Sequence, residues 1–360
     1  MTQTTFTPNT EAPASPPADQ KCVYVIFNPT SGKSDPDERK KIISDALATH
    51  SYTCQFIATT KQQGAKACAE EALAQGADLL AVSGGDGTVM EAMSAVVGKD
   101  IPIAVFPAGT GNLLSVNLGI PMTVPDAVHV ALSGHRYALD LARTGDGHHF
   151  AIMGGLGMDA QMIKDSDREA KKKLGKLAYF VAAVKNLPRR RAHVEIILDD
   201  RPPLRRRVKS VLLANMGKIT GGLEAMPTAS PNDGLLDIGI LKASTPGDWA
   251  RLLGNALLGR AQHDPSLEVY QARRVTLRLR HPQPVEFDGE DGGMTRELTV
   301  EIIPQAVQVL IPEDAPAARD AQDLPPAVVA ERTAKRRLLV PLALLLLVVG
   351  AVLAWRRRKP

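Results

Sequence analysis

Residues 82–93, with the sequence VSGGDGTVMEAM, constrain the fold of this chain more than any other stretch. The apolar residues before Gly84 predict a buried strand, the glycine turn Gly84–Gly87 ends it, and helical spacing begins at Thr88. Glycines let the main chain approach an oligophosphate closely, and the free N–H groups at a helix N-terminus carry partial positive charge. The stretch therefore predicts a phosphate-binding loop, with a tight turn and helix cap as the plainer alternative.

One carboxylate lies inside this glycine turn. Asp86 would repel bare phosphate groups, because like charges in close contact disfavour each other. We therefore expect Asp86 either to hold a metal ion against the phosphates or to bond a ribose or the neighbouring backbone.

Length and composition narrow the class of protein. The chain has 360 residues, more than one hydrophobic core usually organises, so two domains are expected. Its 29 glycines, 26 prolines and 4% aromatic residues suit an α/β protein with many tight connections. A net charge of +4, without aromatic residues interleaved among the arginines, argues against a nucleic-acid partner. Cys22, Cys54 and Cys68 form neither an even disulfide set nor a zinc-ligand pattern, so they are expected to be reduced thiols.

Strands and helices alternate from Lys21 to about Asp140. This alternation predicts a parallel sheet covered by helices on both faces, with ligands beyond the carboxyl ends of the strands. The expected strands are 23–27, 55–59, 78–82 and 101–106, and the expected helices are 37–49, 64–75 and 88–96.

Short segments of β character follow after residue 141. They are expected at 149–153, 194–198, 208–214, 236–241, 275–279 and 298–303, with helical inserts around 167–186 and 246–258. The predicted fold class is therefore α/β with two domains. A parallel α/β nucleotide-binding domain is expected at 21–140, and a mainly antiparallel β domain for the substrate at 141–312.

Both ends of the chain are predicted to lie outside these domains. Residues 1–20 are rich in Thr, Pro and Ala and predict a disordered lead, and 313–337 predict a linker. Eighteen uncharged residues, 338–355, predict a transmembrane helix, and a basic tail follows at 356–360. The expected localisation is a single-pass membrane protein with cytoplasmic catalytic domains, although basic residues on both flanks leave the orientation undecided by charge.

A polar loop follows the first predicted strand. The segment 28–34, NPTSGKS, is not a P-loop, because Phe27 stands where that motif needs glycine. Ser31 and Gly32 nevertheless offer hydroxyl and N–H donors to a phosphate, with a plain turn as the alternative.

A second glycine-rich loop follows the fourth predicted strand. In the segment 107–114, PAGTGNLL, Thr110 and Asn112 stand on glycine hinges. Their polar groups suit bonds to nucleotide or phosphate oxygens, and an Asn N-cap is the alternative.

Two acidic turns lie in the second predicted domain. Asp233, in PTASPNDGLLD at 227–237, could hold a hard divalent cation together with backbone carbonyls, although an Asp-Gly turn needs no metal. The turn VEFDGEDGG at 285–293 carries four acidic residues within six positions, and one of them could have a raised pKa and act as a base. A hairpin turn without chemistry is the alternative.

The combined motifs resemble the diacylglycerol kinase catalytic-domain family, which includes bacterial soluble lipid kinases and the sphingosine and ceramide kinases. The resemblance covers about Lys21 to Pro312. It rests on six segments in the family's order: FNPTSGK, SGGDGTVMEA, PAGTGNLL, GGLGMDA at 154–160, ASPNDGLLD and FDGE.

The resemblance implies where the functional residues lie. It implies an ATP site, to which we add Asn112 from its loop, on Asn28, Pro29, Thr30, Ser31, Gly32, Thr60, Gly84, Gly85, Asp86, Gly87, Thr88, Val89, Met90 and Thr110. It implies a structural magnesium by Ser230, Asp233 and the carbonyl of Leu235, although Ser230 stands where some members have Asp. It implies that Glu290 is the proton acceptor with Asp288 beside it, and Asp86 would orient a magnesium ion that bridges the phosphates. Asp86 and Glu290 must then face one cleft.

The expected function is an ATP- and magnesium-dependent lipid kinase, most directly one that converts diacylglycerol to phosphatidic acid. Sphingoid bases or ceramide are alternative substrates, and an NAD-kinase-like enzyme or a non-catalytic nucleotide or lipid sensor are alternative functions. The expected partners are a membrane lipid substrate and an anionic membrane surface, met by the basic clusters 171–173, 189–191 and 205–207. A homodimer is left open.

Overall fold

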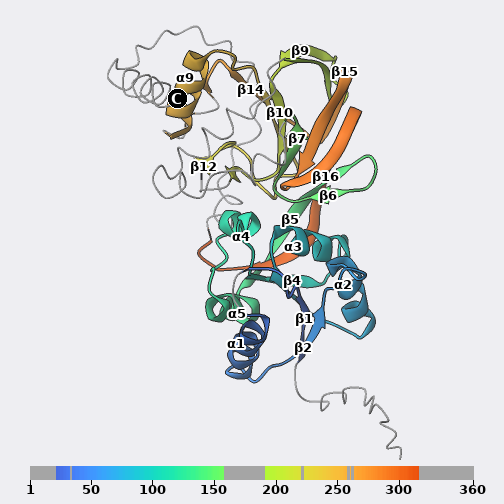
Figure 1. Cartoon of the computed structure of the whole chain (residues 1–360), viewed down its shortest axis with the longest axis vertical. Helices are drawn as coiled ribbons and strands as arrows, with labels where there is room; N and C mark the ends of the chain where they lie inside the picture. The colour runs from blue at the N-terminus through green and yellow to red at the C-terminus, as the bar shows by residue number, and fades with distance from the viewer. Residues whose placement is uncertain are drawn as a thin grey trace, which may run out of the picture.

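The computed structural model describes residues 22–32, 35–157, 191–219, 223–257, 260 and 263–315. The helices are α1 (Pro36–Ala48), α2 (Ala65–Ala74), α3 (Asp86–Ser94), α4 (Leu113–Leu118), α5 (Val124–Ser133) and α9 (Pro246–Leu257). The strands are β1 (Cys22–Phe27), β2 (Thr53–Ala58), β3 (Leu80–Gly84), β4 (Pro102–Pro107), β5 (His135–Thr144), β6 (His149–Phe150), β7 (Met153–Leu156), β8 (Ala192–Leu198), β9 (Leu204–Val208), β10 (Ser210–Ala214), β11 (Lys218–Ile219), β12 (Leu223–Glu224), β13 (Leu236–Leu241), β14 (Leu267–Ala272), β15 (Arg274–Phe287) and β16 (Glu290–Ile311). Figure 1 shows a lower part, in which helices surround β1 to β4, and an upper part made mostly of strands.

The lower part is built on a parallel sheet in the order β2-β1-β3-β4. β3 and β4 are buried along their whole length, which explains why both are continuous apolar runs. Alternate residues of the sheet face two separate cores: α2 and α3 cover one face, and α1 and α5 cover the other. This part is the predicted α/β domain.

The upper part is mainly antiparallel, in the order β14-β13-β10-β7-β15, with β8 and β9 continuing from β15. Glycines let β7 lie between close neighbours: a Cβ on Gly154 would lie 2.5 Å from a ring carbon of Phe287, and one on Gly155 would lie 2.1 Å from the Val211 carbonyl oxygen. The inward side chains form a core of their own. The predicted fold class, a parallel α/β domain followed by a mainly antiparallel β domain, is confirmed.

β16 belongs to both parts of the molecule. Its first half pairs with β15 in the upper part, whereas Gln308 and Val309 pair in parallel with Pro102 and Ile103 of β4. β5 pairs with β16 from Val300 to Ile311, so both strands run through the junction (Figure 1). The expected boundary between residues 140 and 141 therefore falls within β5, and the end of the described chain completes the lower sheet.

Two expected strands are divided in the structure. The expected strand 208–214 is divided at Lys209: Val208 ends β9, an edge strand whose Arg205 and Arg207 point to solvent, and Ser210–Ala214 form β10. The expected strand 149–153 is divided between β6 and β7. The helix expected around 246–258 is α9, and the one expected around 167–186 lies outside the described residues.

The prediction of a single-pass membrane protein is corrected here. None of the helices in the described ranges combines the length and apolar character needed to cross a bilayer. The segment that carried the prediction, 338–355, lies outside the described residues, as do 1–20 and 356–360. The structure therefore gives no support for a membrane-spanning localisation, and we do not retain it.

Candidate active site

Four loops meet at the carboxyl edge of the parallel sheet. In the order of the strands β2, β1, β3 and β4, they contain Thr60, Asn28–Gly32, Gly85 and Ala108–Asn112. Main-chain hydrogen bonds join them to neighbouring strands: the Asn28 N–H donates to the Ser83 carbonyl, and the Ala108 N–H donates to the Gly84 carbonyl, both at 2.9 Å. The structure thus brings the predicted nucleotide-binding segments to one edge, where a parallel α/β sheet places its ligands.

Glycine is required where these loops touch. A Cβ added to Gly109 would lie 2.6 Å from the Gly85 Cα atom. Gly32 has a φ of +83°, and a Cβ there would lie 2.5 Å from the Ala108 carbonyl oxygen. Side chains at these positions would push the loops apart, so the main chain itself forms the surface of this edge.

Asp86 begins α3 and ties it to the next loop. Its Oδ1 accepts a hydrogen bond from the Leu114 N–H at 3.0 Å, so it caps α4 from outside that helix. This bond to neighbouring backbone is one of the roles that the sequence predicted. Its Oδ2 lies beside Gly111, where an added Cβ would be 3.2 Å away, and accepts no hydrogen bond from the described residues. The half-buried side chain therefore keeps one carboxylate oxygen for a ligand.

Arg39 holds the loop after β1 from inside the protein. Its guanidinium donates to the carbonyls of Asn28 and Ser31, and its Cζ lies 4.4 Å from the centroid of the Phe27 ring. Arg39 is only 3% exposed, and burial lowers the pKa of its guanidinium. On the other side of the loop, the Asn28 Nδ2 donates to the Thr88 Oγ1 at 2.9 Å. These bonds fix the loop against the start of α3.

Some predicted nucleotide contacts shape the loops instead. Asn112 has a φ of +46°, its Oδ1 accepts from the Gly109 N–H at 2.8 Å, and its Nδ2 donates to the Gly109 carbonyl at 3.1 Å. The Thr60 Oγ1 likewise accepts from the Gln63 N–H at 3.0 Å, at the start of α2. Thr110 is exposed and makes no hydrogen bond to the described residues, so its hydroxyl is available to a ligand.

Two of the side chains that follow the glycine turn point away from the edge. Val89 and Met90 are buried in the core beneath α3, so they can serve a ligand only through their main chain. The Thr88 side chain fills the space that a Cβ on Gly84 would need, with contacts as short as 2.5 Å. Pro29 and Thr30 lie at the surface of the first loop, and Asn28 Oδ1 accepts from the Thr30 N–H at 3.0 Å.

The β domain brings Glu290 to the start of α3. A Cβ added to Gly87 would lie 2.5 Å from the Glu290 Oε1 atom. Glu290 is the first residue of β16 and is exposed. Because Gly87 follows Asp86 directly, the carboxylates of Asp86 and Glu290 approach the same turn from the two domains. Glu290 therefore lies beside the turn that carries Asp86, and their facing one cleft stays a prediction.

Asp288 fixes the hairpin that carries Glu290. Its carboxylate accepts hydrogen bonds from the N–H groups of Ala151, Ile152 and Met153 at 2.8 to 2.9 Å, and its own N–H donates to the Met153 carbonyl at 2.8 Å. Burial raises the pKa of Asp288 to about 6, with a smaller contribution from the charge of Asp86, against the lowering effect of the three N–H donors. The carboxylate therefore positions the turn from within.

A second acidic group surrounds Asp233. Its Oδ1 accepts from the Leu235 N–H at 2.9 Å, and its Oδ2 has no hydrogen bond to the described residues. Burial raises the pKa of Asp233 to about 6, and the charges of Asp237 and Asp140 add to this effect. The Ser230 hydroxyl, 4% exposed, donates to the Asn232 Oδ1 at 3.1 Å and keeps its lone pairs.

This donor set fits a hard cation. All its donors are oxygens, and a cation would relieve the repulsion between the buried carboxylates. Within the described ranges, no group of three or more His, Cys, Asp or Glu side chains could hold a metal ion. An ion at Asp233 would therefore depend on the Ser230 hydroxyl and on main-chain oxygens such as the Leu235 carbonyl.

Three residues that organise the site were not predicted. Arg39 shares the helical spacing of the buried Ile43 and Leu47, and a basic residue at such a position is a signal that could have found it. Glu91 caps α2, because its Oε2 accepts from the Ala65 N–H at 2.7 Å. Asp140 joins the Asp233 turn to β16 by accepting from the N–H groups of Gly234 and Gln305, both at 2.7 Å. The last two contacts are nonlocal and leave no sequence signal.

Two family models match the two parts of the chain. Residues 22–144 match the diacylglycerol kinase catalytic domain, and residues 153–311 match the YegS C-terminal NAD kinase beta sandwich-like domain. Diacylglycerol kinase from Bacillus subtilis is 29% identical over 76% of this chain and 91% of that protein. Diacylglycerol kinase from Mycobacterium tuberculosis is 29% identical over 67% of this chain and 79% of that protein.

A solved structure shares the fold. The crystal structure of a diacylglycerol kinase from Bacillus anthracis has a TM-score of 0.61 at 20% identity, over 82% of this chain and 97% of that chain. The two family models account for both domains, with Asp86 in the first matched range and Glu290 in the second. The chain therefore belongs to the diacylglycerol kinase catalytic-domain family and is a lipid kinase.

Proposed function

We propose that this lipid kinase transfers the γ-phosphoryl group of ATP to the hydroxyl group of a membrane lipid, with diacylglycerol as substrate and phosphatidic acid as product. The observation that carries the proposal is the contact between Glu290 and Gly87, which sets a carboxylate of the β domain against the glycine turn that we expect to bind phosphate. The names of the Bacillus subtilis and Mycobacterium tuberculosis relatives support diacylglycerol as the acceptor.

The triphosphate of ATP would lie along the carboxyl edge of the sheet. The main chain is exposed there because Gly85 and Gly109 exclude side chains, and α3 directs its free N–H groups to the same place. Asp86 would hold a magnesium ion through its free Oδ2, and that ion would neutralise phosphate charge. The hydroxyl groups of Thr110 and Ser31 would be additional donors on the two flanking loops.

Glu290 would accept the proton of the lipid hydroxyl. As this O–H bond breaks, the lipid oxygen forms a bond to the γ-phosphorus, and the bond between that phosphorus and the β–γ bridging oxygen breaks to release ADP. Asp288 supports this step at one remove, because its three hydrogen bonds hold the turn two residues before Glu290. Positioning of the reacting groups supplies most of the rate enhancement in this class of reaction.

The test is transfer of labelled phosphate from ATP to lipids dispersed in detergent, by the full chain and its variants. Asp86→Asn keeps an acceptor for the Leu114 N–H, and Glu290→Gln keeps the shape of the exposed side chain. We expect each variant to lose at least about 100-fold in kcat while the free energy of unfolding changes little. Asp291→Asn, an exposed acid in the same turn, is the matched control and should keep wild-type kcat.

Several outcomes would contradict the proposal. Glu290→Gln with near wild-type kcat would remove its role as proton acceptor. A panel of diacylglycerol, ceramide, a sphingoid base and NAD identifies the acceptor, and transfer to NAD alone would favour a soluble-substrate kinase. ATP binding without transfer to any acceptor would favour a sensor. Chelation by EDTA should abolish transfer and added magnesium should restore it.

A further inference from the structure

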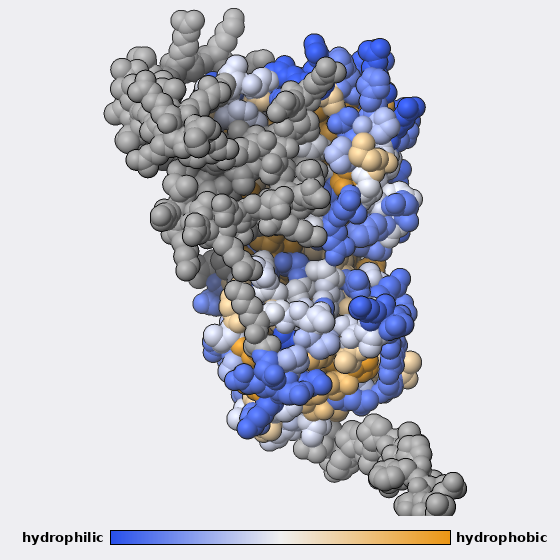
Figure 2. Space-filling model, in the orientation of Figure 1, coloured by the Kyte–Doolittle hydropathy of each residue, from blue (hydrophilic) through white to orange (hydrophobic). Residues whose placement is uncertain are grey.

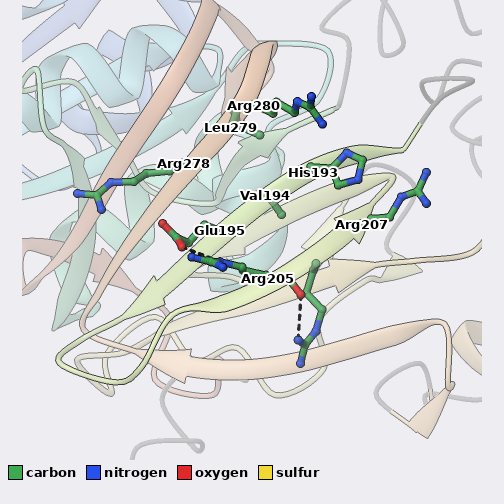
Figure 3. A pocket seen from close by; sticks show the side chains of 9 residues that line it. His193, Val194, Glu195, Arg205, Arg207, Arg278, Leu279 and Arg280 are labelled. Carbon is green, nitrogen blue, oxygen red and sulfur yellow. Dashed lines mark hydrogen bonds and ion pairs between the residues drawn. The ribbon is translucent and has the colours of Figure 1, made fainter.

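A cluster of arginines faces solvent on the β domain, outside the active site. It surrounds a pocket of about 390 Å³ on the outer surface of β8, β9 and β15 (Figure 3). We call this surface the arginine face and define it by the outward side chains of His193, Glu195, Arg205, Arg207, Arg278 and Arg280. These side chains, together with Glu297 of β16, are arranged in two rows that cross the strands.

The first row is internally neutralised. Glu195 pairs in register with Arg205 on one side and with Arg278 on the other. The Arg205 Nε lies 3.1 Å from the Glu195 Oε1, and the Arg278 Nε lies 3.6 Å from the Glu297 Oε2. Two carboxylates thus balance two guanidinium groups, which is the complementary pairing expected across strands.

The second row has no carboxylate. His193 pairs in register with Arg207, and Arg280 follows two residues after Arg278 on β15, on the same side of the strand. Arg207 and Arg280 are exposed, and neither makes an ion pair with any residue that the structure describes. Figure 3 shows His193, Arg207 and Arg280 gathered at one end of the pocket. Arg207 and Arg280 lie on β9 and β15 with β8 between them, and no carboxylate of this row offsets their charge, so an anion would relieve the repulsion between them.

The chemistry of this row matches phosphate groups. Guanidinium groups form forked hydrogen bonds with phosphate oxygens, and three strands hold them at fixed spacing. The residues around the pocket include no Phe, Tyr or Trp, so the surface lacks the stacking groups that a single-stranded nucleic acid would use. Charges exposed on an open sheet suit head groups that lie side by side in a plane.

We propose that the arginine face binds the head groups of anionic phospholipids and docks the enzyme on the bilayer that contains its substrate. The proposal rests on the proposed function, because docking serves an enzyme whose acceptor lies in a bilayer. In Figure 1, β9 and the adjacent part of β15 lie at the end of the β domain away from the nucleotide domain. Substitutions on this face therefore leave the cleft intact.

The experiment measures binding of the full chain to vesicles without ATP. One vesicle is pure phosphatidylcholine, and the other contains about one third phosphatidylglycerol, so their difference isolates the part of binding that depends on negative charge. We expect Arg207→Gln/Arg280→Gln to bind the anionic vesicles roughly 30-fold more weakly than wild type. The wild-type difference should shrink as salt is added.

The matched control is Arg201→Gln/Arg273→Gln. It removes the same charge from two exposed arginines near the opposite ends of the same strands, in the β8–β9 turn and just before β15. We expect this variant to bind anionic vesicles as the wild type does. Equal loss in the two double variants would overturn the proposal, because charge alone would then explain the binding. No loss in Arg207→Gln/Arg280→Gln would overturn it as well.

Two further measurements separate the possible failures. Calorimetry with glycerol phosphate tests whether the arginine face is instead a site for soluble phosphate esters. The docking proposal would be overturned if the wild type bound glycerol phosphate strongly and Arg207→Gln/Arg280→Gln lost that binding without any loss of vesicle binding. Transfer to detergent-dispersed diacylglycerol should be unchanged in both double variants, because the cleft is untouched. Absence of transfer in the wild type, with arginine-dependent vesicle binding intact, would refute the proposed function but not the binding of anionic lipids by the arginine face.

Discussion

Gly87→Ala is expected to separate catalysis from stability. The added methyl carbon would lie 2.5 Å from the Glu290 Oε1, whereas ordinary contact begins at 3.4 Å, so the carboxylate must move by about 1 Å. Glu290 is exposed and can swing outward at little cost. A displacement of about 1 Å in a group that takes part in the reaction lowers the rate roughly 100-fold, which is the expected loss in kcat.

The stability of Gly87→Ala should be unchanged or higher. Gly87 lies in the first turn of α3 and has no positive φ, so alanine fits its backbone. Alanine stabilises a helix relative to glycine by about 0.5 to 1 kcal/mol. Gly254→Ala in α9 is the control, because a Cβ there meets no atom of the described residues within 4 Å. It should gain similar stability and keep wild-type kcat.

A double-mutant cycle tests whether the methyl group acts through Glu290. We measure kcat and the KM for ATP of wild type, Gly87→Ala, Glu290→Ala and the double variant in the detergent assay. In the Glu290→Ala background no carboxylate remains to be displaced, so the added methyl group should cost nothing further. An equal loss of kcat in both backgrounds would refute the reasoning, and so would a rise in the KM for ATP without a fall in kcat. Either result would mean that the methyl group acts on the nucleotide.

Two other predictions concern the residues that hold the site together. Arg39→Ala should raise the KM for ATP and lower the free energy of unfolding by about 3 kcal/mol, because two carbonyls lose a charged donor. Steady-state kinetics measure the KM and urea unfolding measures the stability. An unchanged KM would contradict the role of Arg39 in the loop. The pKa of Asp288 is raised to about 6 in the folded protein, above the unfolded value of about 3.9, so its contribution to stability falls as pH rises between about 4 and 6. Urea unfolding at several pH values should show this fall in wild type and a flatter profile in Asp288→Asn; identical profiles would contradict the assignment.

The nucleotide domain could be predicted from the sequence because its signals are local. β3 and β4 are apolar runs bounded by glycines and prolines, and every loop of the site begins where such a run ends. The glycine pattern likewise predicted a surface made of main chain, which the contact between Gly85 and Gly109 explains.

The prediction failed where pairing is nonlocal. Residues 298–303 stood out as an apolar segment, yet β16 extends from Glu290 to Ile311, and nothing local indicates that its last residues pair with β4. The contact between Gly87 and Glu290 has the same origin, since it depends on how the two domains meet. Asn112 shows a different limit, because its local sequence is compatible with two roles. A polar residue in a glycine loop can bind a ligand or stabilise its own turn, and in the structure Asn112 hydrogen bonds within the turn.

The continuity of β16 has a mechanical consequence. The strand carries Glu290 at its start and hydrogen bonds to the nucleotide sheet at its other end, and β5 runs beside it. The register shift between Ile303 and Val307 is the weak point of this ladder, and Asp140 clamps it through the Gln305 N–H, at a residue whose φ is +51°. The two domains are thus connected by a pair of continuous strands instead of a single hinge loop. They can move apart only as far as these two strands bend.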